Sequence, residues 1–407
     1  MAEFILLMAL LMAMNALSID PMLPAMPDMG RDLDVLRAND RQLIITVYFA
    51  GFGLGSLFYG PLSDRYGRRP VLLVSIALFI VATTVCAVSP NFAVMLVARA
   101  AAGFFAAAGR VVVVGIVRDC VHGDRMASVM SLIFIVFMIV PILAPSYGQL
   151  VLLIAPWRWI FWSLAVTSAI MWFWVAYRLS ETLTAENRIA IGFADLGRTF
   201  MEVVTHRVSI GHMLASGVMM GGMVGFVASV QQIFFDVFRN PGIFPLAFAG
   251  IAGWMAVGSF FNSRLVMRTG ARRLSQGAMI AMALLSGVHT LMAGTGHESL
   301  FLFMLFQSAT MLCLSFAGAN FSAISLEPFG RGAGLASSVQ SALSSVLGAV
   351  LGGVVANAFD GTTVPLSLGY LVFSLLALLI VAWAESWRLF RRPGLAHLRQ
   401  GLESPMR

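Results

Sequence analysis

Long apolar runs alternate with short polar segments along the whole chain. A mostly apolar run of about 18 residues or more can cross a hydrocarbon core of about 30 Å as an α-helix. The pattern predicts twelve membrane-spanning helices joined by short loops, with one longer polar segment. The predicted spans are roughly residues 4–25, 43–62, 70–90, 93–117, 127–153, 157–178, 208–233, 245–267, 273–293, 299–322, 334–356 and 364–387.

The longer polar segment falls near the middle of the 407-residue chain, with six predicted spans on either side. The chain therefore divides into an N-terminal six-helix bundle (1–178), a cytoplasmic linker (179–207), a C-terminal six-helix bundle (208–390) and a cytoplasmic tail (391–407). The expected fold class is an all-α membrane protein with two pseudo-symmetric six-helix halves.

The two halves carry similar sequences between their second and third spans. The stretch GSLFYGPLSDRYGRR begins at Gly55, and GSFFNSRLVMRTGAR begins at Gly258. Glycines, arginines and apolar residues coincide between them, but Met267 stands where the first copy has Asp64. Two parallel six-helix repeats with a substrate path at their interface are the architecture of the major facilitator fold.

Composition places the chain in a membrane. It is 59% hydrophobic and 11% charged, whereas about a quarter of the residues in soluble domains are charged. If the N-terminus is cytoplasmic, nineteen of the 26 basic residues, all of them arginine, lie in the cytoplasmic segments. The preference for basic residues in cytoplasmic loops explains the net charge of +7 without a nucleic-acid partner. It predicts a multi-pass protein of a bacterial inner membrane with both termini in the cytoplasm.

The first apolar run, from Phe4 to Ile19, has neither a basic segment before it nor a small-residue cleavage site after it. We therefore expect it to remain as the first helix and not to be removed as a signal peptide. The three cysteines are isolated, and the sequence has no phosphate-binding loop and no His, Cys or Glu cluster for a metal. We expect no cofactor, no metal site and no enzymatic activity.

The hairpin GPLSDRYGRRP resembles the signature motif of the major facilitator superfamily. The matching positions are Gly60, Leu62, Ser63, Asp64, Arg65, Gly67, Arg68 and Arg69. Two further stretches, LSIDPMLPAMP in the first span and PILAPSYGQL in the fifth, resemble motifs of the bicyclomycin/chloramphenicol-resistance branch of 12-helix drug:proton antiporters. The resemblance is dense from residue 15 to about residue 165.

This resemblance implies a proton-coupled secondary transporter that exports small amphiphilic compounds, drugs or metabolites, by alternating access. Its partners would be a small-molecule substrate, protons and the lipid bilayer, and it would act as a monomer. The same fold runs in both directions, so a proton symporter that imports a metabolite or a siderophore is an alternative. A membrane receptor or scaffold without transport is a third possibility, and the absence of a sizeable soluble domain argues against it.

The resemblance also implies that the hairpin is a conformational latch, formed by Gly60, Asp64, Arg65, Gly67, Arg68 and Arg69. Glycines permit close packing and a turn with positive φ, and arginines attract an anionic leaflet. In related transporters the aspartate contacts the other half and helps to hold the outward-facing state. A basic loop that only sets the topology would explain the arginines but not the spaced glycines and aspartate.

Three charged residues lie inside predicted spans of the first half, where charges are costly and by default mark functional sites. Asp20 precedes Pro21 and lies toward the outer end of its helix; the resemblance implies a proton-coupling role, and a hydrated helix cap is the alternative. Arg99 begins RAAAG, which resembles a fourth-helix motif, and it would act on a proton site or stabilise polar backbone. Arg110, 11 residues further on, would bind an anionic substrate group or reach the cytoplasmic interface.

In the fifth span, Pro141, Pro145 and Gly148 form an antiporter-type motif that would bend the helix and pack closely against the other half. A plain kinked helix is the alternative. Other polar and aromatic residues are predicted to contribute to the substrate cavity together with Arg110. They are Asn15, Tyr48, Phe49, Met138, Gln231, Gln232, Phe235, Phe316 and Asn320.

Overall fold

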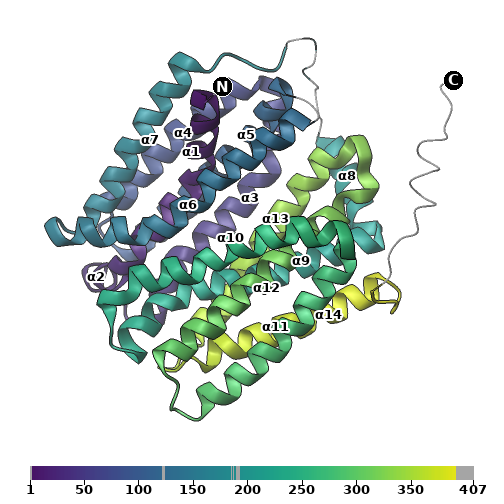
Figure 1. Cartoon of the computed structure of the whole chain (residues 1–407). Coiled ribbons are helices and arrows are strands. Elements are labelled where there is room, and N and C mark those ends of the chain that lie inside the picture. The colour runs from purple at the N-terminus through teal and green to yellow at the C-terminus, as the bar shows by residue number, and fades with distance from the viewer. Residues whose placement is uncertain (1, 122–123, 185, 187, 189–192, 391–407) are drawn as a thin grey trace.

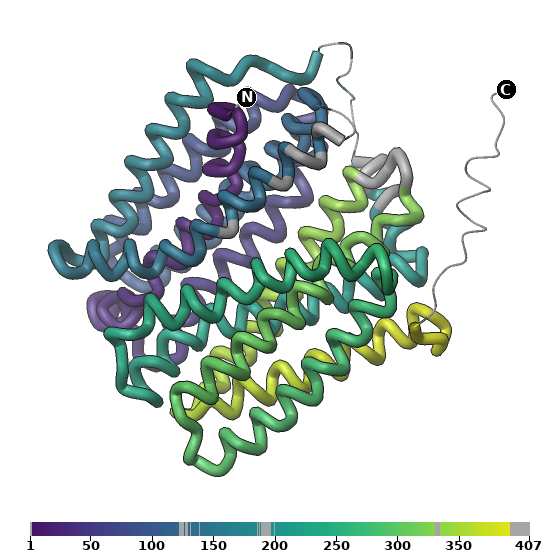
Figure 2. Tube along the Cα trace, in the orientation of Figure 1, coloured from purple at the N-terminus to yellow at the C-terminus, as the bar shows by residue number. Residues whose placement is uncertain are grey.

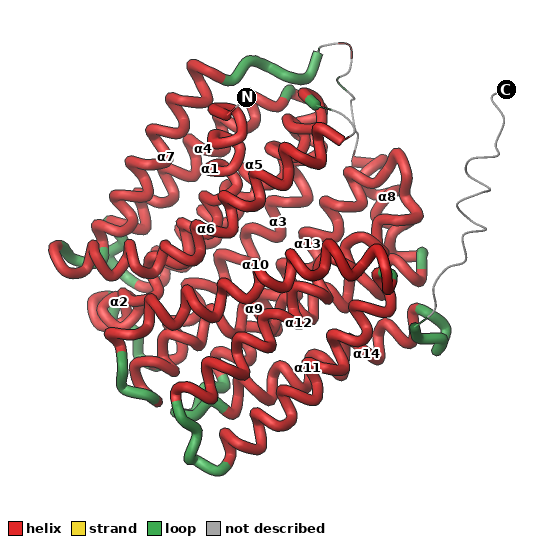
Figure 3. The backbone as a smooth tube through the Cα atoms, viewed as in Figure 1, coloured by secondary structure: helices red, strands yellow, loops and turns green. Residues whose placement is uncertain are grey.

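The computed structural model describes residues 2–121, 124–184, 186, 188 and 193–390, and most of these residues are helical (Figures 1 and 3). Within this part of the chain, twelve helical segments are long and apolar enough to cross a membrane. The predicted number of spans and the all-α fold class are therefore confirmed. The predicted tail lies outside the described residues.

The N-terminal half contains the first six spans and the short helices that extend the first two. Its elements are α1 (Ala2–Ile19), η1 (Asp20–Ala25), α2 (Met26–Asp32), η2 (Ala38–Gln42), α3 (Leu43–Tyr66), α4 (Arg68–Ala87), α5 (Phe92–Cys120), α6 (Asp124–Ile154) and α7 (Arg158–Arg178). The turn between α3 and α4 is made by Gly67 at φ 100°, a conformation that favours glycine. Asn91 caps α5, because its side chain accepts a hydrogen bond from the Val94 amide.

The C-terminal half repeats this plan after one linker helix. Its elements are α8 (Phe193–Thr205) in the linker, then α9 (Arg207–Gln232), the π-helical turn η4 (Ile233–Val237), η5 (Pro241–Ile243), α10 (Phe244–Thr269), α11 (Ala271–Gly294), α12 (Leu300–Leu326), η6 (Glu327–Gly332), α13 (Ala333–Asn357) and α14 (Val364–Ala384). Gly270, at φ 86°, makes the turn between α10 and α11 as Gly67 does in the first half. The two halves therefore share not only similar sequences but also the same backbone conformation at this turn.

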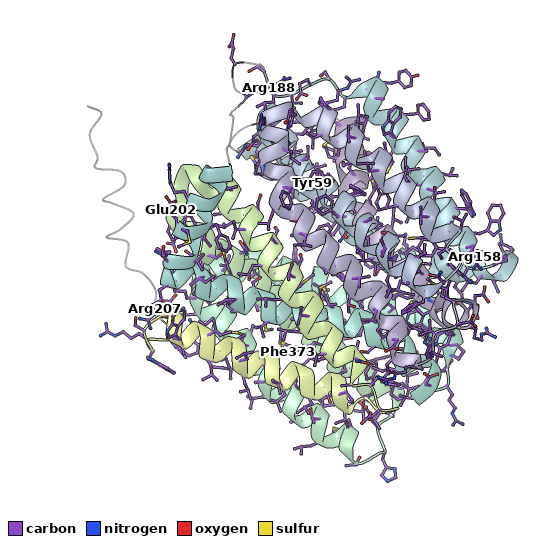
Figure 4. All side chains as sticks on the ribbon, turned by 180° about the vertical axis from the view of Figure 1, so that it is seen from behind. Tyr59, Arg158, Arg188, Glu202, Arg207 and Phe373 are labelled. Carbon is purple, nitrogen blue, oxygen red and sulfur yellow. The ribbon has the colours of Figure 1, made fainter. Side chains whose placement is uncertain are left out.

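Two opposite ends of the bundle are distinguished below. The linker end carries the start of α1, helix α8 and the α3–α4 turn, and the distal end carries α2 and η2 (Figure 2). Figure 4 shows Arg188, Glu202 and Arg207 toward the linker end and Arg158 at the distal end. At the distal end, Asp32 accepts hydrogen bonds from the Trp157 indole and the Arg158 guanidinium, at 2.8 and 2.9 Å.

The two halves meet along two helix pairs, α3 with α13 and α6 with α10. Small residues allow the helices to approach closely. A Cβ on Gly53 of α3 would lie 2.9 Å from the Ser345 Cβ of α13. Within the C-terminal half, a Cβ on Gly352 would lie 2.7 Å from the Gly225 nitrogen, which brings α13 against α9.

Each half holds its linker end together with a similar set of charges. In the first half, Arg68 Nε lies 3.1 Å from Asp119, and Glu181 accepts hydrogen bonds from the Arg68 and Arg69 amides at 2.9 and 3.2 Å. In the second half, Arg272 pairs with Glu385 at 2.7 Å, and with a glutamate at the end of α12. Both sets join a hairpin to the ends of two other helices of its own half.

The linker contains a helix that the polar character of the segment did not predict. Val203 of α8 is fully buried against Met213, Ala336 and Val339 of the C-terminal half, whereas Phe200 is exposed. One face of α8 therefore covers the linker ends of α9 and α13.

Candidate functional site

A cavity of about 790 Å³ lies between the two halves. It is lined by α1, η1, α3, α4, α5 and α6 of the first half and by α9, α10, α12 and α13 of the second. It runs from Asp20 and Phe248 in the distal part of the bundle to Asp64, Arg118 and Gly334 at the linker end. A volume of this size is in the range of small-molecule binding sites.

A cluster of three amide side chains, Asn39, Gln42 and Gln232, joins the halves at the distal end. Gln42 donates a hydrogen bond to Gln232 at 2.7 Å, and Gln232 donates to Asn39 at 3.1 Å. Asn39 in turn donates to the backbone carbonyls of Asn357 and Phe359 at 3.0 and 2.8 Å. The structure is thus closed at the distal end, while the cavity reaches the linker end.

Asp20 lies where the first span stops being an α-helix. Residues Asp20–Ala25 form a 3₁₀ turn, since Pro21 and Pro24 cannot donate the backbone hydrogen bonds of an α-helix. The carboxylate is 6% exposed and faces the cavity. Among the described residues, no side chain gives it a hydrogen bond or an ion pair. Its oxygen atoms are therefore open to a proton or to a donor group of a ligand.

Arg99 is 1% exposed and holds two helices together through their backbones. Its guanidinium donates to the Ser18 carbonyl at 3.0 Å and to the Ile44 carbonyl at 3.2 Å. It also lies over the Tyr48 ring, 4.4 Å from the ring centre. Of the two roles expected for Arg99, these contacts favour the stabilisation of polar backbone, because Ser18 O is at the end of α1, where the helix breaks.

Arg110 and Arg118 present two guanidiniums to the cavity from the linker half of α5. Both side chains are exposed, and neither has a hydrogen-bond or ion-pair partner in the described part of the chain. The Arg118 guanidinium also lies 3.5 Å from where a Cβ on Gly334 of the other half would be. Arg118 was not among the predicted site residues.

The α3–α4 hairpin makes its ion pairs within its own half. Asp64 Oδ1 lies 2.5 Å from Arg68 Nη1, and the same guanidinium bonds Ser63 Oγ at 2.6 Å. Among the described residues, Asp64 does not make the contact with the other half that the resemblance implies, as this structure is closed at the other end of the bundle. Gly60 does approach the other half, since a Cβ there would lie 2.9 Å from Ser338 Oγ.

The remaining predicted latch residues lie around this turn. Gly67 supplies the positive φ, and a Cβ on it would lie 2.4 Å from Glu181 Oε2. The Arg69 guanidinium donates to the Ala176 carbonyl at 2.6 Å. Arg65 lies over the ring of Tyr66, 5.2 Å from its centre.

The antiporter-type motif of α6 packs differently from the expectation. A Cβ on Gly148 would lie 1.8 Å from the carbonyl oxygen of Pro21, so this glycine approaches η1 of its own half and not a helix of the other half. Pro141 lines the cavity and Pro145 is buried. The motif thus supports the backbone directly beside Asp20. Other residues of α6 contact α10 across the interface.

The structure places three of the other predicted cavity residues, Asn15, Phe49 and Arg110, in the cavity lining. Tyr48 lies under Arg99, Gln232 belongs to the distal amide cluster, and Asn320 donates to the Asn262 side chain at 2.7 Å. Gln231, Phe235 and Phe316 are also outside the lining. The side chain of Met138 lies outside the described part of the chain.

The sequence contains a periodic pattern of serines that predicts one more wall of the cavity, and this wall was not among the predicted site residues. Ser337, Ser338, Ser341, Ser344 and Ser345 of α13 all line the cavity. Their spacing of three and four residues puts them on one face of a helix that is otherwise mostly apolar. This periodicity could have identified α13 as a cavity helix.

Two buried histidine–carboxylate pairs lie outside the cavity. His289 Nε2 is 2.6 Å from Glu298 at the distal side, and His212 Nε2 is 3.7 Å from Glu385 at the linker end. Neither pair has a third ligand: in the described residues, no group of three or more His, Cys, Asp or Glu side chains is placed to hold a metal ion.

Known proteins resemble this chain in sequence. A family model described as Major Facilitator Superfamily matches residues 6–353. An uncharacterized MFS-type transporter of Bacillus subtilis is 34% identical over 262 residues, which is 63% of this chain and 65% of that relative, just under two thirds of its length. A bicyclomycin resistance protein homolog of Haemophilus influenzae is 30% identical over 290 residues, 70% of this chain and 71% of the relative. The multidrug resistance protein MdtL of Escherichia coli is 29% identical over 352 residues, 83% and 84% of the two chains.

Solved structures with low sequence identity share the fold. A D-xylose–proton symporter superimposes with a TM-score of 0.72 at 13% identity, over 93% of this chain and 96% of that one. The human organic anion transporter MFSD10 gives a TM-score of 0.66 at 17% identity, over 94% and 99%. Twelve spans, two matching halves and the family match lead to one conclusion: the chain is a transporter of the Major Facilitator Superfamily, and it resembles that family's bicyclomycin- and multidrug-resistance branch.

Proposed function

We propose that the chain exports small amphiphilic compounds in exchange for protons, by alternating access. The observation that carries this proposal is the position of Asp20. Its carboxylate faces the cavity between the halves, has no partner among the described side chains, and sits at a break in a helix. A carboxylate in such a place is the kind of group that exchanges a proton for a substrate donor group.

The exchange follows from competition at one carboxylate. With the cavity open at the linker end, ionised Asp20 binds a donor group of the substrate. After the bundle opens at the distal end, a proton from that side binds to Asp20 and releases the substrate. The protonated protein then returns, and the proton leaves at the linker end. Proton and substrate thus occupy Asp20 in turn, which makes the process an exchange.

We place both termini and the linker in the cytoplasm, on the inner membrane of a bacterial cell, with the chain acting as a monomer. The support is the arginine distribution in the sequence, since this topology puts nineteen of the 26 arginines in cytoplasmic segments. In this orientation the structure is open to the cytoplasm. Asp64 and the rest of the hairpin would then form their contact with the other half in the outward-facing state.

Everted membrane vesicles with an acidified lumen test this function. Bicyclomycin is the first probe, because a relative carries its name. We expect its addition to raise the luminal pH, because protons leave as the compound enters. Co-movement of protons with the compound would instead identify a symporter. A panel of amphiphiles that all leave the luminal pH unchanged would argue for a receptor or scaffold.

A further inference from the structure

We propose that the cavity binds a two-headed amphiphile, which places a cationic or hydrogen-bond donor group at Asp20 and an anionic group at Arg110. This inference deepens the proposed function and rests on it for the exchange step. The binding itself is argued from the cavity alone. The ligand class is therefore amphoteric: a positive head, an apolar body and a negative head.

Three charged residues of the cavity wall, Asp20, Arg110 and Arg118, lack a protein partner among the described residues. Arg110 is eight residues closer along α5 than Arg118 to the level of Asp20, so it forms the pair with Asp20. The Asp64 carboxylate and the Arg68 guanidinium, which also line the cavity, satisfy one another at 2.5 Å. Asp20 and Arg110 have neither hydrogen bonds nor ion pairs with other described residues. Burying a charge is costly unless another group pairs with it, which applies to Asp20, whereas the Arg110 side chain is exposed and lines the cavity. Each of these two groups is therefore available to a ligand group of opposite charge.

Helix packing sets the distance between the two charges. A Cβ on Gly109 would lie 2.6 Å from the carbonyl oxygen of Leu11, so α5 touches α1 at the level of Leu11. Arg110 follows directly, whereas Asp20 is nine residues beyond Leu11 on the first span. At a rise of about 1.5 Å per residue, the two backbone positions are roughly 13 Å apart along the bundle. Both residues line the cavity, so an extended ligand of about eight to ten chain atoms, roughly the length of this separation, can contact both.

The polarity of the cavity walls also changes between the level of Arg110 and the level of Asp20. At the level of Arg110, a Cβ on Gly60 would lie 2.9 Å from Ser338 Oγ and 3.9 Å from Val111 Cγ1, so the serine face of α13 is opposite this part of α5. Hydroxyl groups and a guanidinium suit an anionic head. Closer to the level of Asp20, the wall is made of apolar side chains such as Phe226 and Phe248.

Exchange for protons is compatible with an amphoteric ligand but not with a ligand that is only anionic. An anionic ligand at Arg110 would be attracted more strongly when Asp20 is protonated and neutral, so ligand and proton would bind together. A donor head on Asp20 reverses this relation, because it competes with the proton for the same oxygen atoms. Exchange with protons therefore requires the donor head, and the anionic head adds affinity and orientation.

Three probes with the same apolar chain test the inference on the purified full-length protein in detergent. They are 8-aminooctanoate, octylamine and octanoate, with binding measured by the ligand-dependent shift in melting temperature. We expect 8-aminooctanoate to bind about tenfold or more tighter than either single-headed probe, since each head adds a charge-assisted hydrogen bond. Arg110→Gln should reduce the affinity for 8-aminooctanoate and octanoate about tenfold and leave octylamine unchanged. Arg110→Lys should restore part of the loss, because the charge remains but the planar fork is lost.

Asp20→Asn should give the opposite pattern, with loss of octylamine binding and retention of octanoate. Arg264→Gln is the matched control, because Arg264 lies outside the cavity over the Phe260 ring, and all three affinities should stay as in the wild type. Octylamine binding shows that the Arg110→Gln variant is folded. The inference is overturned if 8-aminooctanoate binds no tighter than octylamine, if none of the probes binds, or if Arg110→Gln leaves octanoate binding unchanged. No gradient is needed, so failure here is distinct from failure of proton exchange in vesicles.

Discussion

Asp20 and Arg99 lie near the same break in the first span but differ in how their charges are satisfied. The Arg99 guanidinium has two backbone carbonyls and an aromatic ring around it. The Asp20 carboxylate has an open cavity in front of it and no side-chain partner among the described residues. A charge that donates hydrogen bonds to the backbone of its own protein holds structure in place, whereas one that faces a cavity can exchange partners.

This difference predicts a structural role for Arg99. Arg99→Gln should lower the stability of the folded protein by roughly 2–5 kcal/mol, because the carbonyls of Ser18 and Ile44 lose charged donors inside the bundle. The measurement is the melting temperature in detergent, together with ΔpH-driven transport per folded molecule. A variant as stable as the wild type that has lost proton coupling would show instead that Arg99 acts on the proton site.

At the scale of elements, the break at η1 depends on α6 as well as on its own prolines. Gly148 of α6 leaves space for the Pro21 carbonyl next to Asp20. The two motifs that the sequence placed in the first and fifth spans are thus in direct contact. Together they fix where the carboxylate faces the cavity.

A single methyl group should disturb this contact. Gly148→Ala places a Cβ 1.8 Å from a backbone oxygen, so the helices must separate, and we expect a loss of about 1–3 kcal/mol in stability and reduced transport. Gly250→Ala is the control: Gly250 is also inside a helix, but a Cβ there meets nothing within 4 Å. The melting temperatures of the two variants in detergent provide the comparison. Equal melting temperatures of the two variants would show that Gly148 is not needed for the packing of α6 against η1.

The sequence predicted the number of spans and the turn at Gly67, because long apolar runs and glycines at fixed places are local signals. It did not predict α8, since a short amphipathic helix in a polar linker becomes visible only through the surface that buries Val203. Gly148 shows a different limit. A small residue marks a close approach, but only the tertiary structure tells which helix approaches. The cavity lining likewise depends on tertiary structure: Tyr48 and Asn320 lie outside it because each packs within its own half, against Arg99 and Asn262.

At the scale of the whole molecule, the structure represents one end of a conformational cycle. The distal end is closed by the neutral amides Asn39, Gln42 and Gln232, and the cavity reaches the linker end. Contacts made in only one state bias the population of that state. The amide cluster should therefore hold the molecule in the conformation described here.

Gln42→Ala should shift the equilibrium toward opening at the distal end. Loss of one buried amide hydrogen bond, worth about 0.5–1.5 kcal/mol, corresponds to a change of roughly two- to twelvefold in the ratio of the two states. Spin labels at Leu36 and Asn240, exposed distal positions in opposite halves, report this as a larger fraction of long distances. Arg264→Gln, which lies away from the amide cluster, is the control and should leave the distance distribution unchanged. An unaltered distribution in Gln42→Ala would show that the amides do not bias the equilibrium.

The central claim, that Asp20 couples transport to protons, is tested most directly by Asp20→Asn in proteoliposomes. Two assays with labelled bicyclomycin separate coupling from movement: accumulation driven by a pH gradient, and exchange of labelled for unlabelled compound without a gradient. The account predicts that the variant loses gradient-driven accumulation and keeps exchange. The amide cannot carry a proton, but its oxygen still accepts a hydrogen bond from a neutral donor group of the compound, and the bundle can still alternate. Gradient-driven accumulation by the Asn variant at the wild-type level would contradict the account.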